Sequence, residues 1–217
     1  MKQIVTKDNS ITFHNEEYDE SYHSVSGALE EAFEKFAKPC KLKDGMKVLD
    51  ICFGLGYNSL AAISLADVEI VALEKDSSIL KEIKDLKLPL NYKINDKINN
   101  ELIKNYEKIK KAAEKLNYED NKVKIKIMLG DARKTIKTLD EKFDVVFLDP
   151  FSPKKCPELW TEEFFYDICK IMRKKAVLAT YSCARIVRDN LKNAGFMVED
   201  GPCVGRKSPA TLAYKQL

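Results

Sequence analysis

The stretch Val48-Leu-Asp-Ile-Cys-Phe-Gly-Leu-Gly-Tyr-Asn58 decides the fold of this chain. It begins as an apolar strand, ends in a turn with glycines and continues into a helix. Gly54 and Gly56 let the backbone approach a ligand closely, and the first N–H groups of the helix can bind a carboxylate or phosphate. Cys52 stands where a first glycine often does, so the turn lacks the Gly-x-Gly-x-x-Gly spacing of dinucleotide sites, which argues against NAD.

On either side of that stretch, short apolar runs alternate with helical patterns. The expected strands are Lys47–Phe53, Glu69–Glu74, Val123–Leu129, Phe143–Asp149, Ala176–Tyr181, Phe196–Val198 and Ala210–Tyr214. The expected helices are Ser59–Leu65, Ser77–Leu86, Ile98–Leu116, Glu162–Met172 and Ala184–Asn193. Apolar runs joined by helical crossovers indicate a parallel sheet with helices on both faces. We therefore predict an α/β fold with a Rossmann-like, doubly wound, mainly parallel seven-stranded sheet.

Length and composition limit what else the chain can be. With 217 residues it has room for one well-buried core, and we expect a single domain over residues 1–217. Residues 1–40 are expected to form an N-terminal cap with a helix from Gly27 to Phe36, and residues 95–122 a charged helical insertion. No apolar run reaches the length of a membrane span, and the N-terminus lacks a signal-peptide pattern, so we expect a cytoplasmic protein with no membrane partner.

Cysteines, histidines and charge exclude little beyond a metal centre. The six cysteines include no Cys-x-x-Cys pair and there are only two histidines, so we predict no metal site. Free thiols suit a reducing cytosol. The net charge of +3 neither demands nor excludes a nucleic-acid partner, because a local patch matters more than the sum.

Polar groups at the ends of three expected strands fit the parts of one ligand. The glycine turn suits an amino-acid end, and Glu74, about twenty positions after the turn, suits ribose hydroxyls. Asp131, at the end of the third strand, can accept a hydrogen bond from an adenine amine. S-adenosylmethionine has these three parts and needs no phosphate-binding lysine. The residues expected to bind it are Asp50, Gly54, Gly56, Asn58, Glu74, Lys75, Gly130, Asp131, Ala132 and Asp149.

The fourth strand ends in Asp149-Pro-Phe-Ser-Pro153, beside the switch point where ligands bind in doubly wound sheets. This turn is similar to the Asp-Pro-Pro-aromatic turn of amine-directed methyltransferases. A carboxylate there can orient the N–H bonds of an acceptor amine and take its proton. We therefore predict that Asp149 is the catalytic residue and that Phe151 forms a wall of the acceptor pocket.

A longer segment around this turn resembles a known family. Asp149-Pro-Phe-Ser-Pro-Lys-Lys-Cys-Pro-Glu-Leu-Trp160-Thr-Glu-Glu-Phe-Phe165 resembles the methyltransferase part of the bacterial tRNA wobble-uridine modification protein MnmC. The resemblance covers the chain from about Asp19 onward, except for the charged helix at Ile98–Leu116. The other stretches that carry it are Tyr22-His-Ser24, Leu29-Glu-Glu31, Phe36, Leu178-Ala-Thr-Tyr-Ser182, Val187-Arg188, Ala194-Gly-Phe196 and Gly205-Arg-Lys207.

The resemblance implies the substrate and further site residues. It implies methylation of 5-aminomethyluridine, with or without a 2-thio group, at the wobble position of tRNA. The chain has no room for the FAD-dependent oxidase domain of the bacterial proteins, so we expect no FAD and an aminomethyl substrate made elsewhere. Cys52 and Pro150 depart from the family, which typically has glycine at both positions. The resemblance implies that the acceptor contacts are Tyr22, Ser24, Glu30, Glu31, Phe151 and Trp160.

Basic residues in the second half of the chain are expected to contact tRNA phosphates. They follow the fourth, fifth and sixth strands, on or near the edge that carries the site. The candidates are Lys154, Lys155, Arg185, Arg188, Arg206 and Lys207.

Three other functions use the same fold. An aminopropyltransferase of the spermidine synthase kind usually has a glycine-richer turn and two acidic residues where this chain has the single Asp149. An RNA-binding module without activity would have lost the glycine turn or the acidic strand ends. A methyltransferase for another amine, on DNA, protein or a small molecule, differs from a tRNA enzyme only in the acceptor, and fold does not settle that.

Overall fold

The computed structural model describes residues 1–88 and 96–215, in which eight strands form one mainly parallel sheet. The strand order is β10-β11-β9-β8-β4-β5-β7-β6. The neighbouring pairs from β9 to β7 are parallel, whereas β6, β10 and β11 pair antiparallel. The strands are β4 (Lys47–Ile51), β5 (Glu69–Glu74), β6 (Asn117–Glu119), β7 (Lys124–Leu129), β8 (Phe143–Leu148), β9 (Met172–Thr180), β10 (Phe196–Asp200) and β11 (Thr211–Lys215).

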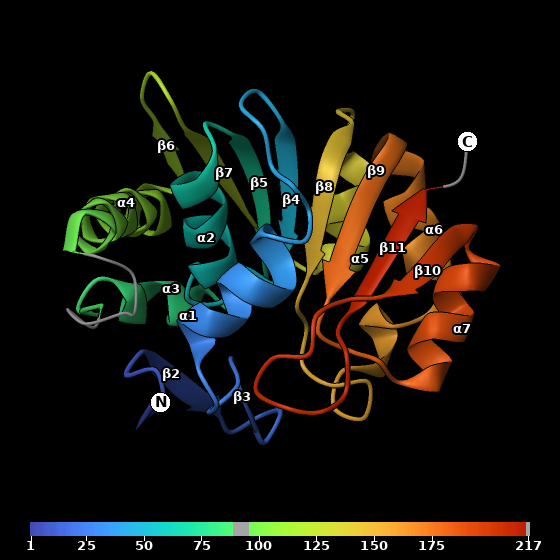
Figure 1. The fold of residues 1–217 in the computed structure, drawn as a ribbon, viewed down its shortest axis with the longest axis horizontal. Coiled ribbons are helices and arrows are strands. Elements are labelled where there is room, and N and C mark those ends of the chain that lie inside the picture. Colours follow the sequence, from blue (N-terminus) through green and yellow to red (C-terminus); the bar gives the residue numbers. More distant parts are fainter. Residues whose placement is uncertain (89–95, 216–217) are drawn as a thin grey trace.

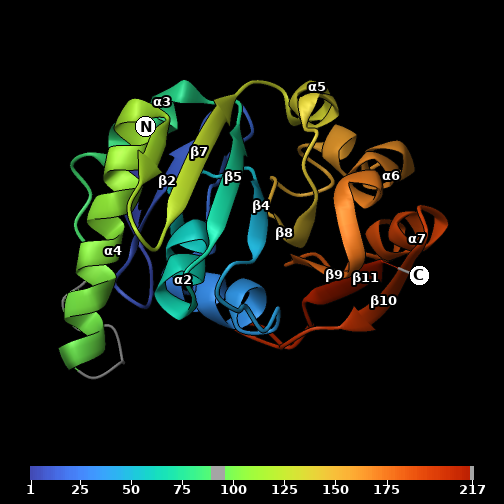
Figure 2. The ribbon, with the colours of Figure 1, turned by 90° about the horizontal axis from the view of Figure 1, so that it is seen from above.

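Helices cover both faces of this sheet (Figures 1 and 2). They are α2 (Tyr57–Leu65), α3 (Ser77–Ile83), α4 (Asp96–Lys115), α5 (Ala132–Thr135), α6 (Glu162–Ile171) and α7 (Arg185–Asn193). One apolar core contains side chains of α2, α3 and α4, and a second contains those of α5, α6 and α7. The central strands are apolar on both sides because they separate these cores. The predicted doubly wound α/β fold is confirmed.

The predicted count of seven strands is wrong, because β6 is an eighth. Its three residues, Asn-Tyr-Glu, are polar and pair antiparallel with β7 at the edge of the sheet. A short edge strand with one face in water has no apolar run by which the sequence could reveal it. The helix expected at Ile98–Leu116 is α4, which ends just before β6. Residue 95, where the charged insertion was expected to begin, lies outside the described residues.

The first 40 residues place a small sheet at the carboxyl ends of the parallel strands and pack a helical segment on one face of the main sheet (Figure 1). They contain a small antiparallel sheet of β1 (Lys2–Val5), β2 (Ile11–Asn15) and β3 (Glu20–Ser21), followed by α1 (Ala28–Glu31). A π-helical segment, Ala32–Ala37, continues α1. The sequence predicted one regular helix here. A π-helical turn is rare and often occurs at functional sites.

Helix α4 supports the glycine turn from behind. Tyr106 stacks on Tyr57 with 5.8 Å between ring centroids, and its hydroxyl donates to the carbonyl of Leu55. Gly56 adopts φ 75°, and a Cβ atom there would lie 2.5 Å from Cγ2 of Ile109. The second glycine of the turn is therefore required by packing against α4 as well as by its left-handed conformation.

Gly56→Ala is expected to destabilise the protein more than Gly45→Ala. Both glycines have positive φ, but a Cβ at Gly45 would meet no atom of the described residues within 4 Å. Gly45→Ala should cost about 1–2 kcal/mol of backbone strain, and Gly56→Ala about 1–3 kcal/mol more from overpacking. Denaturant titration measures both free energies of unfolding. Equal losses in the two variants would contradict the packing role of Gly56.

Candidate active site

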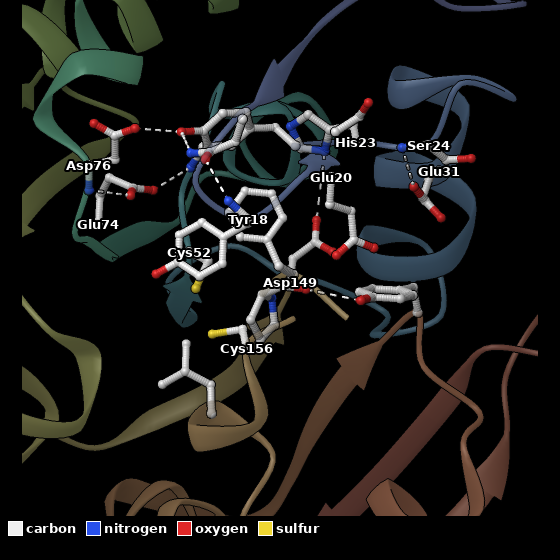
Figure 3. Close-up of a pocket in the computed structure, with 18 of the residues that line it drawn as sticks. Tyr18, Glu20, His23, Ser24, Glu31, Cys52, Glu74, Asp76, Asp149 and Cys156 are labelled. Carbon is white, nitrogen blue, oxygen red and sulfur yellow. Dashed lines mark hydrogen bonds and ion pairs between the residues drawn. The ribbon is translucent and has the colours of Figure 1, made fainter. Parts of the chain in front are cut away.

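The ends of β4, β5, β7 and β8 meet the cap around a cavity of about 800 Å³ (Figure 3). Because the carboxyl ends of parallel strands share one edge of the sheet, residues far apart in sequence line the same space. Seven of the ten residues expected to bind the cofactor line this cavity. They are Gly54, Glu74, Lys75, Gly130, Asp131, Ala132 and Asp149.

The other three expected cofactor residues lie beneath the cavity wall. Asp50 is fully buried and accepts a 2.6 Å hydrogen bond from Ser59, and burial raises its pKa to about 7. Gly56 packs under α4, and Asn58 donates to Asp149. The sequence places all three in or beside the glycine turn but cannot show that none of them lines the ligand space.

Glu74 fixes the wall formed by β4 and β5. Its carboxylate accepts a 2.8 Å hydrogen bond from the backbone N–H of Gly54 and another of 2.8 Å from that of Asp76. Burial raises the pKa of Glu74 above its usual value, and these N–H donors oppose the shift. Each carboxylate oxygen can accept further bonds, so Glu74 can hold the turn and still bind hydroxyl groups in the cavity.

Asp131 caps α5, accepting from the backbone N–H of Arg133 at 3.0 Å. The Arg133 guanidinium also donates to this carboxylate, which keeps the pKa of Asp131 below its usual value. Beside it, Lys75 donates to the hydroxyl of Tyr18 at 3.2 Å. The end of the cavity near Asp131 is thus lined by polar groups that already have hydrogen-bond partners in the protein.

Asp149 follows β8 and is the buried carboxylate on the other side of the cavity. Its Oδ2 accepts a 2.8 Å hydrogen bond from Asn58. The same oxygen lies 3.8 Å from Nδ1 of His23, and Asp149 and His23 are both labelled in Figure 3. Burial raises the pKa of Asp149 well above its usual value, and the nearby Glu31 carboxylate raises it further. An aspartate held this way takes up a proton more readily than one in water.

Next to Asp149 is a buried ion pair that the sequence analysis missed in part. Glu31 accepts from Lys35 at 2.5 Å, and both side chains line the cavity. Lys35 is 3% exposed and lies in the π-helical segment. The i,i+4 spacing of the two residues was a usable signal, but such pairs usually lie on solvated helix faces.

His23 was also missed. Its imidazole is buried, which lowers its pKa to about 4, and its Nε2 has no hydrogen-bond partner among the residues that the structure describes. Nε2 lies 3.6 Å from the position that a Cβ atom would occupy on Gly54. A neutral imidazole thus faces the glycine turn from the cap.

Residues 16–22, which comprise the turn after β2, strand β3 and Tyr22, form a strap across the cavity. On the β5 side, the hydroxyl of Tyr22 donates to Asp76 at 2.5 Å. On the β8 side, Glu20 accepts from the backbone N–H of Ser152 at 2.9 Å. Phe151 stacks on Tyr18 with 4.6 Å between centroids, so the predicted wall residue contacts the strap.

The predicted acceptor and tRNA residues divide into two groups. Tyr22, Ser24, Glu31, Phe151 and Arg206 line the cavity, and Arg206 donates to the carbonyl of Tyr181. The others lie outside the lining. Glu30 is exposed, and Trp160 is buried in the second core, where it donates to the Phe151 carbonyl. Three of the basic residues form ion pairs: Lys155 with Asp19, Arg185 with Asp189 and Arg188 with Asp200. Lys154 and Lys207 do not line the cavity.

Neither a membrane helix nor a metal cluster is found in residues 1–88 and 96–215. No helix there is long and apolar enough to cross a membrane. No three His, Cys, Asp or Glu side chains there are grouped to hold a metal ion.

The cavity fits S-adenosylmethionine. Gly54 has no side chain, and a Cβ there would contact His23 and Tyr22 at 3.6 Å, so the glycine lets its backbone approach an amino-acid end closely. Glu74 offers acceptors for ribose hydroxyls one strand away. The volume of about 800 Å³ leaves additional space on the Asp149 side for a second molecule.

Comparisons with known proteins agree with this fit. A model of the S-adenosyl-L-methionine-dependent methyltransferase family matches residues 93–216. An uncharacterised protein of Methanocaldococcus jannaschii is 36% identical over 98% of this chain and 59% of its own length. The tRNA 5-methylaminomethyl-2-thiouridine biosynthesis bifunctional protein MnmC of Leptospira interrogans is 28% identical over 94% of this chain and 34% of its own length. The crystal structure of MnmC2 from Aquifex aeolicus matches with a TM-score of 0.81 and 34% identity, over 98% of this chain and 69% of that one.

The fold, the cavity and these matches define an S-adenosylmethionine-dependent methyltransferase. Within that class, the chain belongs to the family of the methyltransferase part of the MnmC proteins. It spans 59% of the Methanocaldococcus protein and about a third of the Leptospira protein.

Glu74→Gln is expected to weaken binding of S-adenosylhomocysteine about tenfold, because a neutral amide holds the Gly54 turn and ribose hydroxyls less well. Glu69→Gln is the matched control, since Glu69 is exposed at the opposite end of the same strand. Isothermal titration calorimetry measures both dissociation constants. An unchanged affinity in Glu74→Gln would refute the role of Glu74 in cofactor binding.

Proposed function

We propose that this protein methylates the aminomethyl nitrogen of 5-aminomethyluridine, with or without a 2-thio group, at the wobble position of tRNA. The observation that carries the proposal is the carboxylate of Asp149, whose side chain is 8% exposed, on the acceptor side of the cofactor cavity. The matched MnmC protein is named for 5-methylaminomethyl-2-thiouridine biosynthesis on tRNA, which supports this acceptor.

The charges around Asp149 suit a cationic amine. Asp149 and Glu31 carry two negative charges when ionised and Lys35 one positive charge, so the group attracts one further cation. An aminomethyl group in water is mostly an ammonium ion and enters as that cation. To react, it must first give up a proton.

Asp149 accepts that proton. An N–H bond of the ammonium breaks, the proton bonds to the carboxylate, and the electron pair stays on nitrogen. S-adenosylmethionine supplies an activated methyl group on its sulfonium sulfur. The lone pair on nitrogen forms the new C–N bond, and the electron pair of the broken S–C bond stays on sulfur. Because Asp149 must start ionised, activity is expected to fall as the pH drops through its raised pKa.

The mouth of the cavity offers groups for the nucleotide around the amine. The rings of Tyr18 and Phe151 lie on the strap side and suit contact with a base. Lys7 and Arg206 also line the cavity and can contact phosphates beside the wobble nucleotide. Lys155 and Arg188 are already paired with Asp19 and Asp200, which makes them weaker candidates.

Methyl transfer from radiolabelled S-adenosylmethionine tests the proposal. The acceptors are tRNA that carries 5-aminomethyluridine at the wobble position and the same tRNA with unmodified uridine. We expect label only in the modified tRNA, recovered as 5-methylaminomethyluridine. A protein that binds S-adenosylhomocysteine but labels neither tRNA would refute this acceptor.

Asp149→Asn is expected to lower turnover by about two to four orders of magnitude, the usual contribution of a general base. Its affinity for S-adenosylhomocysteine should stay within about threefold, because the amide keeps the shape of the side chain. Asp144→Asn is the matched control at the start of β8, where Asp144 pairs with Arg173 away from the cavity. Similar turnover in Asp149→Asn and Asp144→Asn would exclude Asp149 as the base.

Arg206→Ala is expected to raise the KM for tRNA about tenfold and to reduce the slope of log KM against log salt by about one, as for a lost phosphate contact. Its affinity for S-adenosylhomocysteine should not change. Arg173→Ala serves as the control, because Arg173 pairs with Asp144. Steady-state kinetics at several salt concentrations give both slopes. An unchanged slope in Arg206→Ala would exclude a contact between Arg206 and a tRNA phosphate.

A further inference from the structure

The two oxygens of the Asp149 carboxylate have different surroundings. Oδ2 accepts a 2.8 Å hydrogen bond from Nδ2 of Asn58 and lies 3.8 Å from Nδ1 of His23. Within the part of the chain that the structure describes, Oδ1 accepts no hydrogen bond. Because Asp149 lines the cavity, Oδ1 is the oxygen left for a bound molecule.

Asn58 reaches Asp149 because of where α2 begins. Strands β4 and β8 are parallel neighbours, and Ile51 is paired with Leu148 at their carboxyl ends. The glycine turn therefore starts α2 beside the residue that follows β8. Asn58 is 2% exposed, and in residues 1–88 and 96–215 its own Oδ1 has no hydrogen-bond partner. A buried amide with an unsatisfied oxygen is costly, and such groups often mark functional sites.

We propose that Asn58 is a positioning residue that occupies Oδ2 of Asp149 and so directs Oδ1 toward the acceptor amine. His23, from the cap, flanks the same Oδ2 and keeps other donors from it. The proposal rests on the role of Asp149 in the proposed function, and it assigns the amine proton to Oδ1. It also moves Asn58 from the cofactor's amino-acid end, where the sequence placed it, to the base.

The charged groups around Asp149 give this role a measurable consequence. Burial is the largest cause of the raised pKa of Asp149, and the carboxylates of Glu31 and Asp50 raise it further. The hydrogen bond from Asn58 and the charge of Lys35 lower it. His23 is neutral near pH 7 because burial lowers its pKa to about 4. Without Asn58, the ionised form of Asp149 loses its donor, and its pKa must rise.

Carbon-13 NMR of protein labelled in the aspartate carboxyl carbons measures this pKa directly, with S-adenosylhomocysteine bound. The signal of Asp149 is identified by its absence in Asp149→Asn. Asn58→Ala is expected to raise the titration midpoint of Asp149 by about one pH unit, the scale of one hydrogen bond to a charged group. The acidic limb of the kcat/KM profile on aminomethyl tRNA should move up by the same amount.

Ser59→Ala is the matched control. Ser59 follows Asn58 in α2, is equally buried and donates to Asp50, not to Asp149. Its removal makes Asp50 harder to ionise, so the midpoint of Asp149 should stay unchanged or fall slightly. Should Asn58→Ala fail to fold, Asn58→Ser replaces it, because its shorter side chain also loses the contact, and the same rise is expected.

Two results would overturn the proposal. One is an unchanged Asp149 midpoint without Asn58, and the other is an equal rise in Ser59→Ala. Failure of the proposed function is distinct, because wild-type protein would then leave aminomethyl tRNA unlabelled while the NMR titration still reports on Asn58.

Discussion

The carboxylate of Glu74 bridges the backbone N–H groups of Gly54 and Asp76, and the cavity depends on this bridge. One bond holds the glycine turn against the end of β5. The other holds the start of α3, where the side chain of Asp76 accepts from Tyr22 of the cap. Tyr22 in turn accepts from Asn15 in β2. A single buried acid thus connects the turn, the helix and the cap around one space.

Placing carboxylates in that space has an electrostatic consequence. Burial disfavours the ionised form, so the pKa values of Glu74 and Asp149 both rise. Glu74 is stabilised by two backbone donors, whereas Asp149 has one side-chain donor and a second carboxylate nearby. The first environment suits a fixed acceptor for hydroxyl groups and the second suits a group that gains and loses a proton.

The sequence predicts those parts of the site that depend on local pattern and on the topology of the sheet. The ends of parallel strands meet at one edge, so Gly54, Glu74, Asp131 and Asp149 could be brought together without coordinates. The hydrogen bond from Asn58 to Asp149 depends on the direction in which α2 leaves the turn, which spacing does not encode. The cap contributes His23, Lys35 and the strap through long-range contacts, which leave no periodic pattern in the sequence. The edge strand β6 is polar, so no apolar run in the sequence reveals it.

The most direct test is a crystal structure of the protein with S-adenosylhomocysteine and an anticodon stem-loop that carries 5-aminomethyluridine. We expect the amine nitrogen within hydrogen-bond distance of Oδ1 of Asp149, with Asn58 still bonded to Oδ2 and the ribose hydroxyls of S-adenosylhomocysteine bonded to Glu74. An amine bound away from Asp149, with the cofactor product in place, would contradict it.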